Sequence, residues 1–274
     1  MIKLIASDLD GTLLLNGAQA LPEELFELIR ELKELGILFV AASGRQYYNM
    51  KNLFRPVMQE IGYICENGAL ALRNEEVLFM DAFDPVLARE IMETIYEKEG
   101  AEFTCSTRDF YYIRPKSVEY LYLMEQVIKN ECRVIQSFEE VTEPCLKLAV
   151  FESRGTDEAT IRYWQERFSD RCKVVSSGND WIDFAPLHTN KANGIHAYRE
   201  ILKIQPEECM VFGDECNDIE MLESVPYSFV MKHSKECVKQ HAKYQVERVE
   251  PILKLLIEKK GNIEEVIKCI TKNV

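Results

Sequence analysis

One stretch decides the fold: Ile2-Lys3-Leu4-Ile5-Ala6-Ser7-Asp8-Leu9-Asp10-Gly11-Thr12-Leu13-Leu14. Its short apolar run predicts a buried strand, and two carboxylates, Asp8 and Asp10, stand where the strand should end. Because side chains alternate along a strand, we expect both carboxylates on the same side, where their charges repel each other. Gly11 permits a tight turn, and the Thr12 hydroxyl could fix a neighbouring carboxylate. The stretch therefore predicts a site that needs a compensating cation.

The next segments extend this strand into a parallel sheet. Residues 21–35 have the pattern of an amphipathic helix, with acids in the first turn and a glycine just past the end. Residues 37–41 predict a second buried strand, which ends in Ala42-Ser43-Gly44-Arg45. A right-handed crossover makes the two strands parallel, so Asp8 and Ser43 should face the same crevice. An Asp-Gly turn alone can follow any strand without a function, and this second strand end argues against that alternative.

The alternation of strands and helices changes between residues 83 and 188. There the sequence predicts helices mixed with antiparallel strand pairs, whereas strict alternation resumes at Lys191. We therefore predict an α/β fold with two parts. A Rossmann-like parallel-sheet core is expected from residues 1–82 and 189–274, and an inserted α/β domain from residues 83–188.

Composition and charge narrow the class of protein. The 274 residues are 47% hydrophobic and 29% charged, which is typical of a globular enzyme. We find no run of 18 apolar residues and no basic leader, so we expect neither a membrane span nor a signal peptide, and a cytoplasmic protein. The net charge of −13 disfavours nucleic acid and anionic membranes as partners. An anionic substrate would have to be attracted locally, inside one pocket.

The nine cysteines do not indicate a disulfide framework or a zinc site. Their number is odd and none forms a CxxC pair. Cys216 stands next to the predicted site, where oxidation is conceivable, but we interpret it as an inert helix thiol.

Four separated segments should end at the same sheet edge, where open α/β sheets bind ligands. These segments are Asp8-Leu9-Asp10-Gly11-Thr12, Ser43-Gly44-Arg45, Lys191 and Gly213-Asp214-Glu215-Cys216-Asn217-Asp218. Mg²⁺ prefers hard oxygen ligands, and Asp8 and Asp214 are the natural pair to hold it. A carboxylate can attack phosphorus directly, and a second acid can protonate the leaving oxygen, best with a raised pKa. Ser43 and the amide of Gly44 can bind phosphate oxygens, and Lys191 can stabilise the charge of the transition state.

These four segments, together with Met221, resemble the four motifs of the haloacid dehalogenase-like phosphatases, specifically those of the Cof-type subfamily. The insertion lies where that subfamily carries an α/β cap. The resemblance implies that Asp8 is the nucleophile and Asp10 the acid/base. It implies Mg²⁺ as the cofactor, held by Asp8, the main-chain carbonyl of Asp10, and Asp214. It further implies that Asp218 supports Lys191 or the metal shell, and that phosphate is contacted by Leu9 (main chain), Ser43, Gly44, Lys191 and Asn217. From the residues themselves we also predict Thr12 and Arg45 as supporting residues.

The predicted reaction is Mg²⁺-dependent hydrolysis of a small phosphorylated metabolite, such as a sugar phosphate, through an aspartyl-phosphate. A phosphomutase would share the first half of this mechanism, and a non-catalytic phosphometabolite-binding protein could retain the site. The absence of a GxGxxG fingerprint after the first strand disfavours hydride transfer. The segments Val225–Ser234 and Val246–Pro251 depart from the family pattern, as does Asn193. These departures leave the subfamily placement and the substrate open, but not the reaction. The oligomeric state does not follow from the sequence.

Several further residues have two interpretations. Arg45 could reach a substrate or form a structural salt bridge. For Asn67 we favour a turn residue, and for His188 a linker residue. Four side chains of the insertion could line a pocket or simply pack: Tyr111, Tyr112, Arg114 and Lys116.

Overall fold

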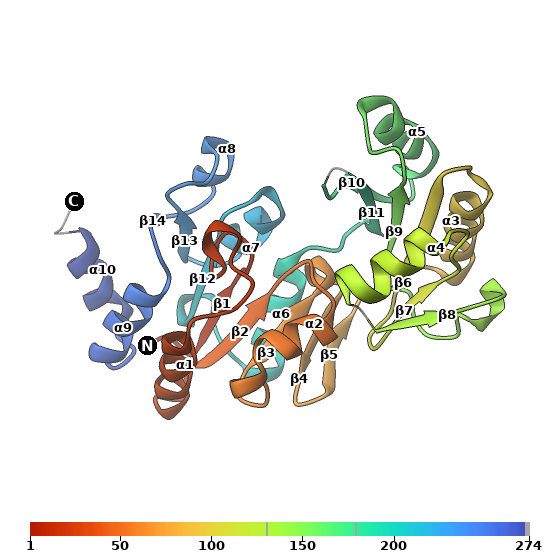
Figure 1. Ribbon diagram of the computed structural model, residues 1–274. Helices are drawn as coiled ribbons and strands as arrows, with labels where there is room; N and C mark the ends of the chain where they lie inside the picture. The colour runs from red at the N-terminus through yellow and green to blue at the C-terminus, as the bar shows by residue number, and fades with distance from the viewer. Residues whose placement is uncertain (130, 179, 272–274) are drawn as a thin grey trace. The chain divides into compact units, whose positions relative to one another are not determined.

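The computed structural model describes residues 1–129, 131–178 and 180–271. The predicted core residues 272–274 lie outside the described residues. The chain divides into two compact units (Figure 1). The first contains Met1–Arg45, Met50–Phe79 and the chain from Asn190 onward; the second contains Gln46–Asn49 and Met80–Thr189. No helix in the described part of the chain is long and apolar enough to cross a membrane.

The first unit is built on an eight-stranded sheet in the order β14-β13-β12-β1-β2-β3-β4-β5. From β14 to β3, all neighbouring strands are parallel, and β3 and β4 are antiparallel. The strands are β1 (Leu4–Ser7), β2 (Leu38–Ala42), β3 (Gly62–Cys65), β4 (Leu70–Arg73), β5 (Glu76–Met80), β12 (Cys209–Gly213), β13 (Tyr227–Met231) and β14 (Tyr244–Val246). The opening strand β1 lies between β12 and β2, as Figure 1 shows.

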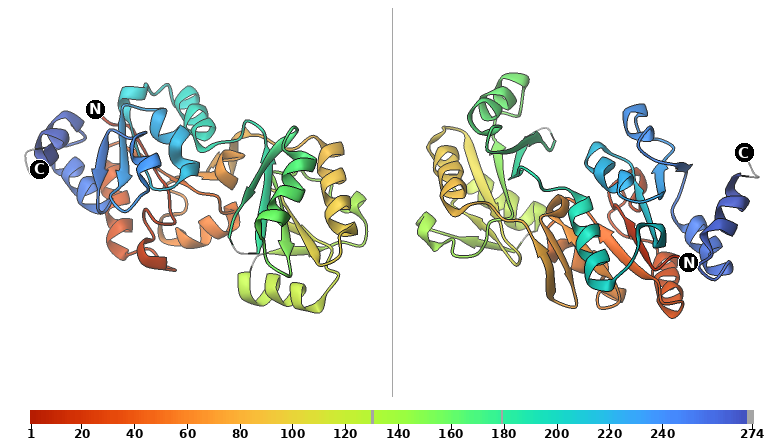
Figure 2. Two further views of the ribbon diagram at one scale, coloured as in Figure 1. Left: turned by 90° about the horizontal axis from the view of Figure 1, so that it is seen from above. Right: turned by 180° about the vertical axis from the view of Figure 1, so that it is seen from behind.

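Helices cover both faces of this sheet (Figure 2). The helices are α1 (Glu23–Glu34), α2 (Tyr47–Leu53), α6 (Lys191–Leu202), α7 (Ile219–Glu223), α8 (Glu236–Lys239), α9 (Glu250–Glu258) and α10 (Ile263–Thr271). Short 3₁₀ turns are η1 (Leu15–Gly17), η2 (Arg55–Val57), η3 (Glu66–Gly68), η6 (Pro206–Glu208) and η7 (Cys216–Asp218). Buried residues of α6 and α7 form one cluster with Leu4 and Ala6 of β1. On the other face, Phe39 and the α1 residue Phe26 both pack against Phe54.

The helix α6 lies unusually close to the sheet. A Cβ on Gly194 would be 2.6 Å from the side chain of Ile64 in β3. The Tyr198 hydroxyl donates to the Leu72 carbonyl at 2.5 Å and accepts from the Tyr63 amide at 2.9 Å. Glycine packing and a buried hydroxyl thus fix the helix that begins at Lys191.

The second unit is built on a six-stranded sheet in the order β10-β11-β9-β6-β7-β8. Its pairs are antiparallel except β7 with β8. The strands are β6 (Ala101–Ser106), β7 (Tyr111–Ile113), β8 (Cys132–Val134), β9 (Lys147–Glu152), β10 (Cys172–Ser176) and β11 (Trp181–Pro186). The helical segments are α3 (Pro85–Glu97), α4 (Val118–Tyr122), the π-helical η4 (Leu123–Ile128), η5 (Phe138–Glu140) and α5 (Glu158–Phe168).

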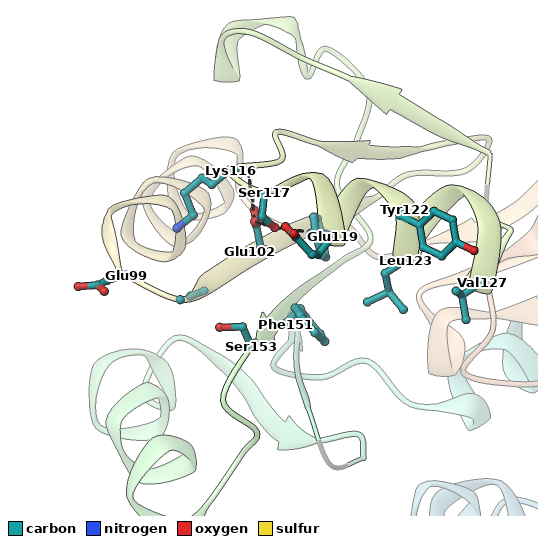
Figure 3. A pocket seen from close by; sticks show the side chains of 13 residues that line it. Glu99, Glu102, Lys116, Ser117, Glu119, Tyr122, Leu123, Val127, Phe151 and Ser153 are labelled. Atoms are coloured by element: carbon teal, nitrogen blue, oxygen red, sulfur yellow. Dashed lines mark hydrogen bonds between the residues drawn. The ribbon is translucent and has the colours of Figure 1, made fainter.

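The two faces of this sheet carry separate apolar clusters. Val150 packs in the cluster that contains α3 and α5 residues, whereas the next residue, Phe151, packs with Tyr120 of α4. Alternation along β9 accounts for the two faces. A cavity of about 660 Å³ lies beside α4, lined by apolar side chains such as Leu123 and Phe151 and by Ser117 at its polar end (Figure 3). Lys116, one of the side chains considered for a pocket, lines it, whereas no residue of the four motif segments does.

The α/β fold class with a parallel-sheet core is confirmed. The prediction was incomplete in detail: β4, β14 and α8 were not foreseen. One helix of the insertion changes type along its length: α4 continues as η4, where Leu123–Ile128 widens into π-helical hydrogen bonding.

Candidate active site

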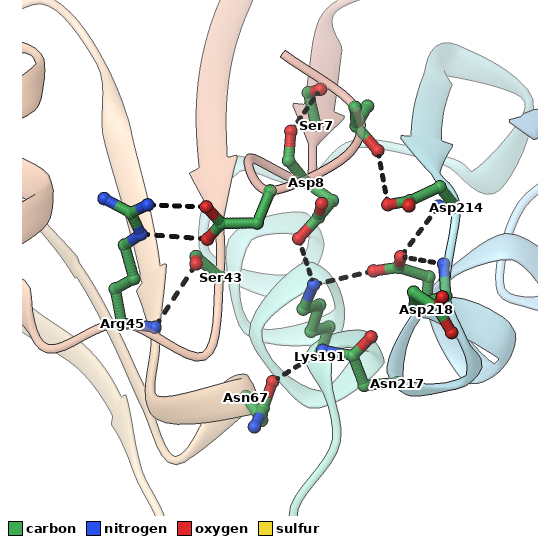
Figure 4. Close-up of polar contacts among 12 residues, drawn as sticks. Ser7, Asp8, Ser43, Arg45, Asn67, Lys191, Asp214, Asn217 and Asp218 are labelled. Carbon is green, nitrogen blue, oxygen red and sulfur yellow. Dashed lines mark hydrogen bonds and ion pairs between the residues drawn. The ribbon is translucent and has the colours of Figure 1, made fainter. Parts of the chain in front are cut away.

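The predicted site residues gather at the carboxyl ends of three neighbouring strands (Figure 4). Asp8 follows β1, Ser43 follows β2 and Asp214 follows β12. Because β1 pairs in parallel with both neighbours, the three strands end at the same edge. Lys191 reaches the same place from the first position of α6. The four separated segments of the sequence are therefore brought together.

The turn after β1 packs directly against Asp214. Gly11 has a positive φ of 92°, and a Cβ there would lie 2.1 Å from Asp214 Oδ2. The Thr12 hydroxyl donates to Asp214 Oδ1 at 2.9 Å. The Leu9 carbonyl accepts the amides of Thr12, Leu13 and Leu14. Because a carbonyl oxygen cannot donate to a phosphate oxygen, any hydrogen bond of the Leu9 main chain to phosphate must come from its amide.

Lys191 is buried and lies between two carboxylates. Its Nζ donates to Asp8 Oδ1 at 2.6 Å and to Asp218 Oδ1 at 2.7 Å. Asn190 caps the start of α6, accepting a hydrogen bond from the Asn193 amide. Gly68 has a φ of 104°, and a Cβ at this position would lie only 1.9 Å from the carbonyl oxygen of Asn190. The absence of a side chain therefore allows the Asn190 backbone to approach closely. A glycine and a cap thus position the lysine.

Asp218 is fully engaged by protein groups. Its Oδ2 accepts the amides of Asp214 and Glu215, at 2.9 and 3.1 Å, while Oδ1 binds Lys191. Both oxygens have donors, so Asp218 orients the lysine and the Asp214 loop.

The site carries more negative than positive charge. Burial raises the pKa of Asp8 well above its ordinary value, despite the opposing effect of Lys191. Burial also raises the pKa of Asp214, although its hydrogen bond from Thr12 acts against this. Burial alone would lower the pKa of Lys191, but Asp218 and Asp8 outweigh it and raise that pKa. Lys191 stays charged and cannot neutralise three carboxylates.

The donor set fits a divalent metal ion such as Mg²⁺. Asp8 Oδ2 is buried and accepts no hydrogen bond from any described residue. Among the described residues, Asp8, Asp214 and Asp218 each offer an oxygen, and these oxygens lie within 4.8 Å of one another. Because Asp218 is occupied by donors, Asp8 and Asp214 are the two suited to be ligands. Hard, crowded carboxylates with an unmet acceptor are what such an ion requires.

Asp10 lies outside this buried cluster and is half exposed. Its carboxylate accepts Arg45 Nη2 at 2.5 Å and Arg45 Nε at 2.9 Å. The Ser43 hydroxyl in turn accepts the Arg45 amide at 3.2 Å. Of the two interpretations of Arg45, the salt bridge is the one observed, and its partner is the predicted acid/base.

Two further residues lie at the site that the sequence did not assign to it. Asn67, interpreted as a turn residue, does have a left-handed φ of 55°, but its Oδ1 also accepts Asn217 Nδ2 at 2.9 Å. The same oxygen would lie 2.9 Å from a Cβ on Gly44. His233 Nε2 lies 3.6 Å from Asp214 Oδ2. The signal for both was position: each follows a strand of the same sheet.

The side chains considered in the insertion make contacts within the second unit, and one of them, Lys116, also lines the cavity beside α4. The Tyr112 hydroxyl donates to Glu143, and the Arg114 guanidinium lies 4.4 Å above the Tyr96 ring. Lys116 Nζ donates to the carbonyls of Tyr96 and Lys98. Tyr111 is buried in β7. His188 belongs to the last residues of the same unit.

Comparisons with known proteins agree with this architecture. The chain is similar to the 5-amino-6-(5-phospho-D-ribitylamino)uracil phosphatase YbjI of Escherichia coli, with 28% identity over 89% of this chain and 90% of that protein. It is 25% identical to the HMP-PP phosphatase of Citrobacter koseri, over 84% of each chain.

Two solved structures share the fold. TM0651 from Thermotoga maritima matches with a TM-score of 0.80 and 24% identity, over 93% of this chain and 97% of that one. The subclass IIB sugar phosphatase BT4131 matches with a TM-score of 0.73 and 22% identity, over 97% and 98% of the two chains. The family model described as haloacid dehalogenase-like hydrolase matches residues 5–251. The chain therefore belongs to the haloacid dehalogenase-like hydrolases.

Proposed function

We propose that this protein is a Mg²⁺-dependent phosphatase that hydrolyses small phosphomonoesters through an aspartyl-phosphate on Asp8. The single observation that supports this most is the state of the Asp8 carboxylate. One oxygen is held by Lys191, and the other is buried without a donor from the described residues, beside Asp214. A carboxylate fixed in this way is oriented to attack and depends on a cation to meet an anionic substrate.

The metal ion would be held by the carboxylates of Asp8 and Asp214 and by the main-chain carbonyl of Asp10, and it would neutralise charge between nucleophile and phosphoryl group. Thr12 orients Asp214 through its hydroxyl. Asp218 supports the loop through the two amides that it accepts. These contacts restrict the freedom of the Asp214 carboxylate before the metal binds.

Phosphate is bound by groups that can donate hydrogen bonds. Lys191 Nζ supplies a charge next to the attacking carboxylate, where negative charge accumulates in the transition state. The Ser43 hydroxyl and the amides of Leu9 and Gly44 are proposed to hold the phosphate oxygens. The side-chain amide of Asn217 is a further proposed donor; in this structure its Nδ2 donates to Asn67 Oδ1.

Asp10 is the proposed general acid and base. Its half-exposed carboxyl group gives it access to solvent and to a leaving oxygen, while Arg45 holds it in place. It donates a proton to the leaving alkoxide and then accepts one from the water that hydrolyses the aspartyl-phosphate. Because donation requires a protonated carboxyl, the Arg45 contact must loosen when substrate binds.

The substrate class follows from charge and from the relatives. The named relatives act on phosphorylated ribitylaminouracil and on HMP-PP, both of them small molecules as named. The net charge of −13 disfavours polyanionic substrates. We therefore propose a small phosphorylated metabolite, with the second unit as the cap that selects it.

The test is phosphate release from a panel of phosphorylated metabolites, measured with Mg²⁺ and with EDTA. We expect metal-dependent release from several sugar phosphates or nucleotide-like esters. Single-turnover reaction followed by acid quench should trap phosphate on the peptide that contains Asp8. Transfer of phosphate to a second hydroxyl of a sugar bisphosphate would instead identify a mutase, and no release from any ester would contradict the proposal.

A further inference from the structure

The turn that follows β3 has a strained backbone. Its residues Glu66, Asn67 and Gly68 all have positive φ angles, of 49°, 55° and 104°. Glycine adopts this left-handed region readily, but residues with side chains do so only where the surroundings hold them. Because β3 is parallel to β2, the turn lies at the same sheet edge as Ser43. Strain at a ligand-binding edge is typical of functional segments.

The backbone of this turn is hydrogen-bonded on both sides of Gly44. The Asn67 amide donates to the Ser43 carbonyl at 3.0 Å, and the Glu66 amide donates to the Arg45 carbonyl at 3.1 Å. The Asn67 side chain fills the space beside Gly44 itself, because a Cβ there would lie 2.9 Å from Asn67 Oδ1 and 3.1 Å from its Nδ2. The turn therefore fixes the loop whose hydroxyl and amide are proposed to hold phosphate.

The same side chain reaches a second segment of the site. Asn67 Oδ1 accepts a hydrogen bond from Asn217 Nδ2 at 2.9 Å, and Figure 4 shows the two side chains facing each other. Asn217 is exposed, and among the described residues Asn67 is the hydrogen-bond partner of its side chain. Next along the turn, Gly68 lies against the carbonyl of Asn190, the residue before Lys191. One turn thus contacts three of the four segments that form the site.

The contact between Asn67 and Asn217 decides what Asn217 can offer to a substrate. The amide nitrogen of an asparagine side chain carries two hydrogens, while its oxygen can only accept. Asn67 Oδ1 takes one hydrogen of Asn217 and leaves the other for a phosphate oxygen. Without this acceptor, the exposed side chain would rotate, and some of its orientations would present an oxygen that repels phosphate.

We propose that Asn67 is a positioning residue, which orients the Asn217 amide toward the phosphoryl group of the substrate. This inference rests on the proposed phosphatase function and adds to it a residue outside the four motif segments. Asn67 acts through Asn217 and touches no reacting atom. Its loss should therefore weaken the binding of phosphate in the ground state and in the transition state alike, which raises KM and leaves kcat nearly unchanged.

The test replaces Asn67 by glycine, which keeps the left-handed backbone and removes only the side chain. The matched control is Asn74→Gly in the turn between β4 and β5, where the asparagine is exposed and has a similar φ of 51°. Both variants gain the same freedom in the unfolded chain, so a change in Tm from this source is common to both. The kinetics use p-nitrophenyl phosphate with Mg²⁺, and inorganic phosphate as a competitive inhibitor.

Asn67→Gly should raise KM and the inhibition constant of inorganic phosphate by about tenfold, the effect of one lost hydrogen bond to a charged group. Its kcat should stay within about threefold of the wild-type value, and Asn74→Gly should match wild type in all three constants. In the double variant with Asn67→Gly and Asn217→Ala, the constants should equal those of Asn217→Ala alone, because Asn67 acts through Asn217.

Additive effects of Asn67→Gly and Asn217→Ala would overturn the proposal, as would an Asn67→Gly protein that loses Tm but keeps the KM and the phosphate affinity of wild type. Wild-type activity together with equal behaviour of Asn67→Gly and Asn74→Gly would overturn this inference alone. A wild-type protein that neither releases nor binds phosphate would contradict the proposed function, and this inference with it.

Discussion

Both units of the molecule bury carboxylates, but their surroundings differ. In the second unit, Glu102 accepts the Lys116 amide and the Ser117 hydroxyl, and Glu152 accepts Lys98 Nζ and the Trp164 indole, both at 2.7 Å. Every oxygen of these two side chains has a donor. In the first unit, Asp8 has an oxygen without a donor among the described residues, and Asp8 and Asp218 share one lysine beside a third buried carboxylate, Asp214.

This difference distinguishes structural carboxylates, whose oxygens all accept hydrogen bonds, from carboxylates of a ligand-binding site. A buried charge with all its partners is part of the structure, whereas a buried charge with an unmet acceptor costs stability until a cation arrives. The comparison predicts that substitutions in the two places have opposite effects on stability and activity.

The largest effect is expected from Asp8→Asn. Activity should fall by at least about 10³-fold, because the amide cannot attack phosphorus. The metal-free variant should unfold at the same temperature as wild type or higher, since burial raises the pKa of Asp8 and disfavours its ionised form in the folded protein. Steady-state kinetics and thermal unfolding in EDTA check both. The same change at exposed Asp170 should leave both the activity and the unfolding temperature unchanged. An Asp8→Asn protein with wild-type turnover would rule out Asp8 as the nucleophile.

Substitution of Lys191, the lysine shared by Asp8 and Asp218, should reduce both stability and activity. In Lys191→Met, Asp8 and Asp218 lose their common donor, so the free energy of unfolding should fall by about 3–5 kcal/mol. The kcat should fall by about 10²–10³-fold where folding is intact. Urea unfolding and kinetics at low temperature measure these values. Lys254→Met, at a half-exposed lysine, is the control, and equal behaviour of the two variants would contradict the assignment.

Substitution of a structural carboxylate in the second unit should reduce stability but not activity. Glu152→Gln keeps the side-chain shape but places an amide against the donors of Lys98 and Trp164, at a cost of about 1–3 kcal/mol. Both tryptophans, Trp164 and Trp181, lie in the second unit, so their fluorescence follows its unfolding. The urea midpoint should decrease while kcat changes little. A large loss of kcat in fully folded Glu152→Gln would show that the two kinds of carboxylate are not distinct.

The smallest effect is expected at a surface pair. Arg171 donates two hydrogen bonds to Glu90, of 2.6 and 2.8 Å. This hydrogen bonding lowers the pKa of Glu90 from its ordinary 4.5. The stabilisation is present above pH 4.5 and is lost as the pH falls through the lowered value in the folded protein. Arg171→Ala should therefore reduce Tm slightly at pH 7, and this difference should shrink as the pH is lowered below 4.5. A pH-independent difference would exclude this pair as its source.

The sequence was most informative where strands end. Asp8, Ser43 and Asp214 could be placed together because apolar runs of four or five residues mark parallel strands, and parallel strands end at one edge. The Thr12 hydroxyl, in the turn after the first strand, was expected to fix a neighbouring carboxylate, and the structure shows that this carboxylate is Asp214.

The remaining features depend on tertiary contacts that leave little pattern. The strand β4 is the Ala- and Leu-containing segment Leu70–Arg73, whose residues do not favour strands by themselves, and β14 has three residues in a polar segment. The contact of His233 with Asp214 arises from two strands that pair in space, not in sequence. The Asp10–Arg45 pair was only one of two open alternatives, because a side chain of that length reaches several positions.

The central place of β1 has a consequence for synthesis on the ribosome. Leu4 pairs with Leu38 on one side but with Cys209 on the other, so one edge of the first strand waits for a partner made about 200 residues later. At roughly 10 residues per second this delay is about 20 seconds. During that interval the contiguous segment Met80–Thr189 can already fold, while the nascent first strand exposes unpaired backbone groups to other chains.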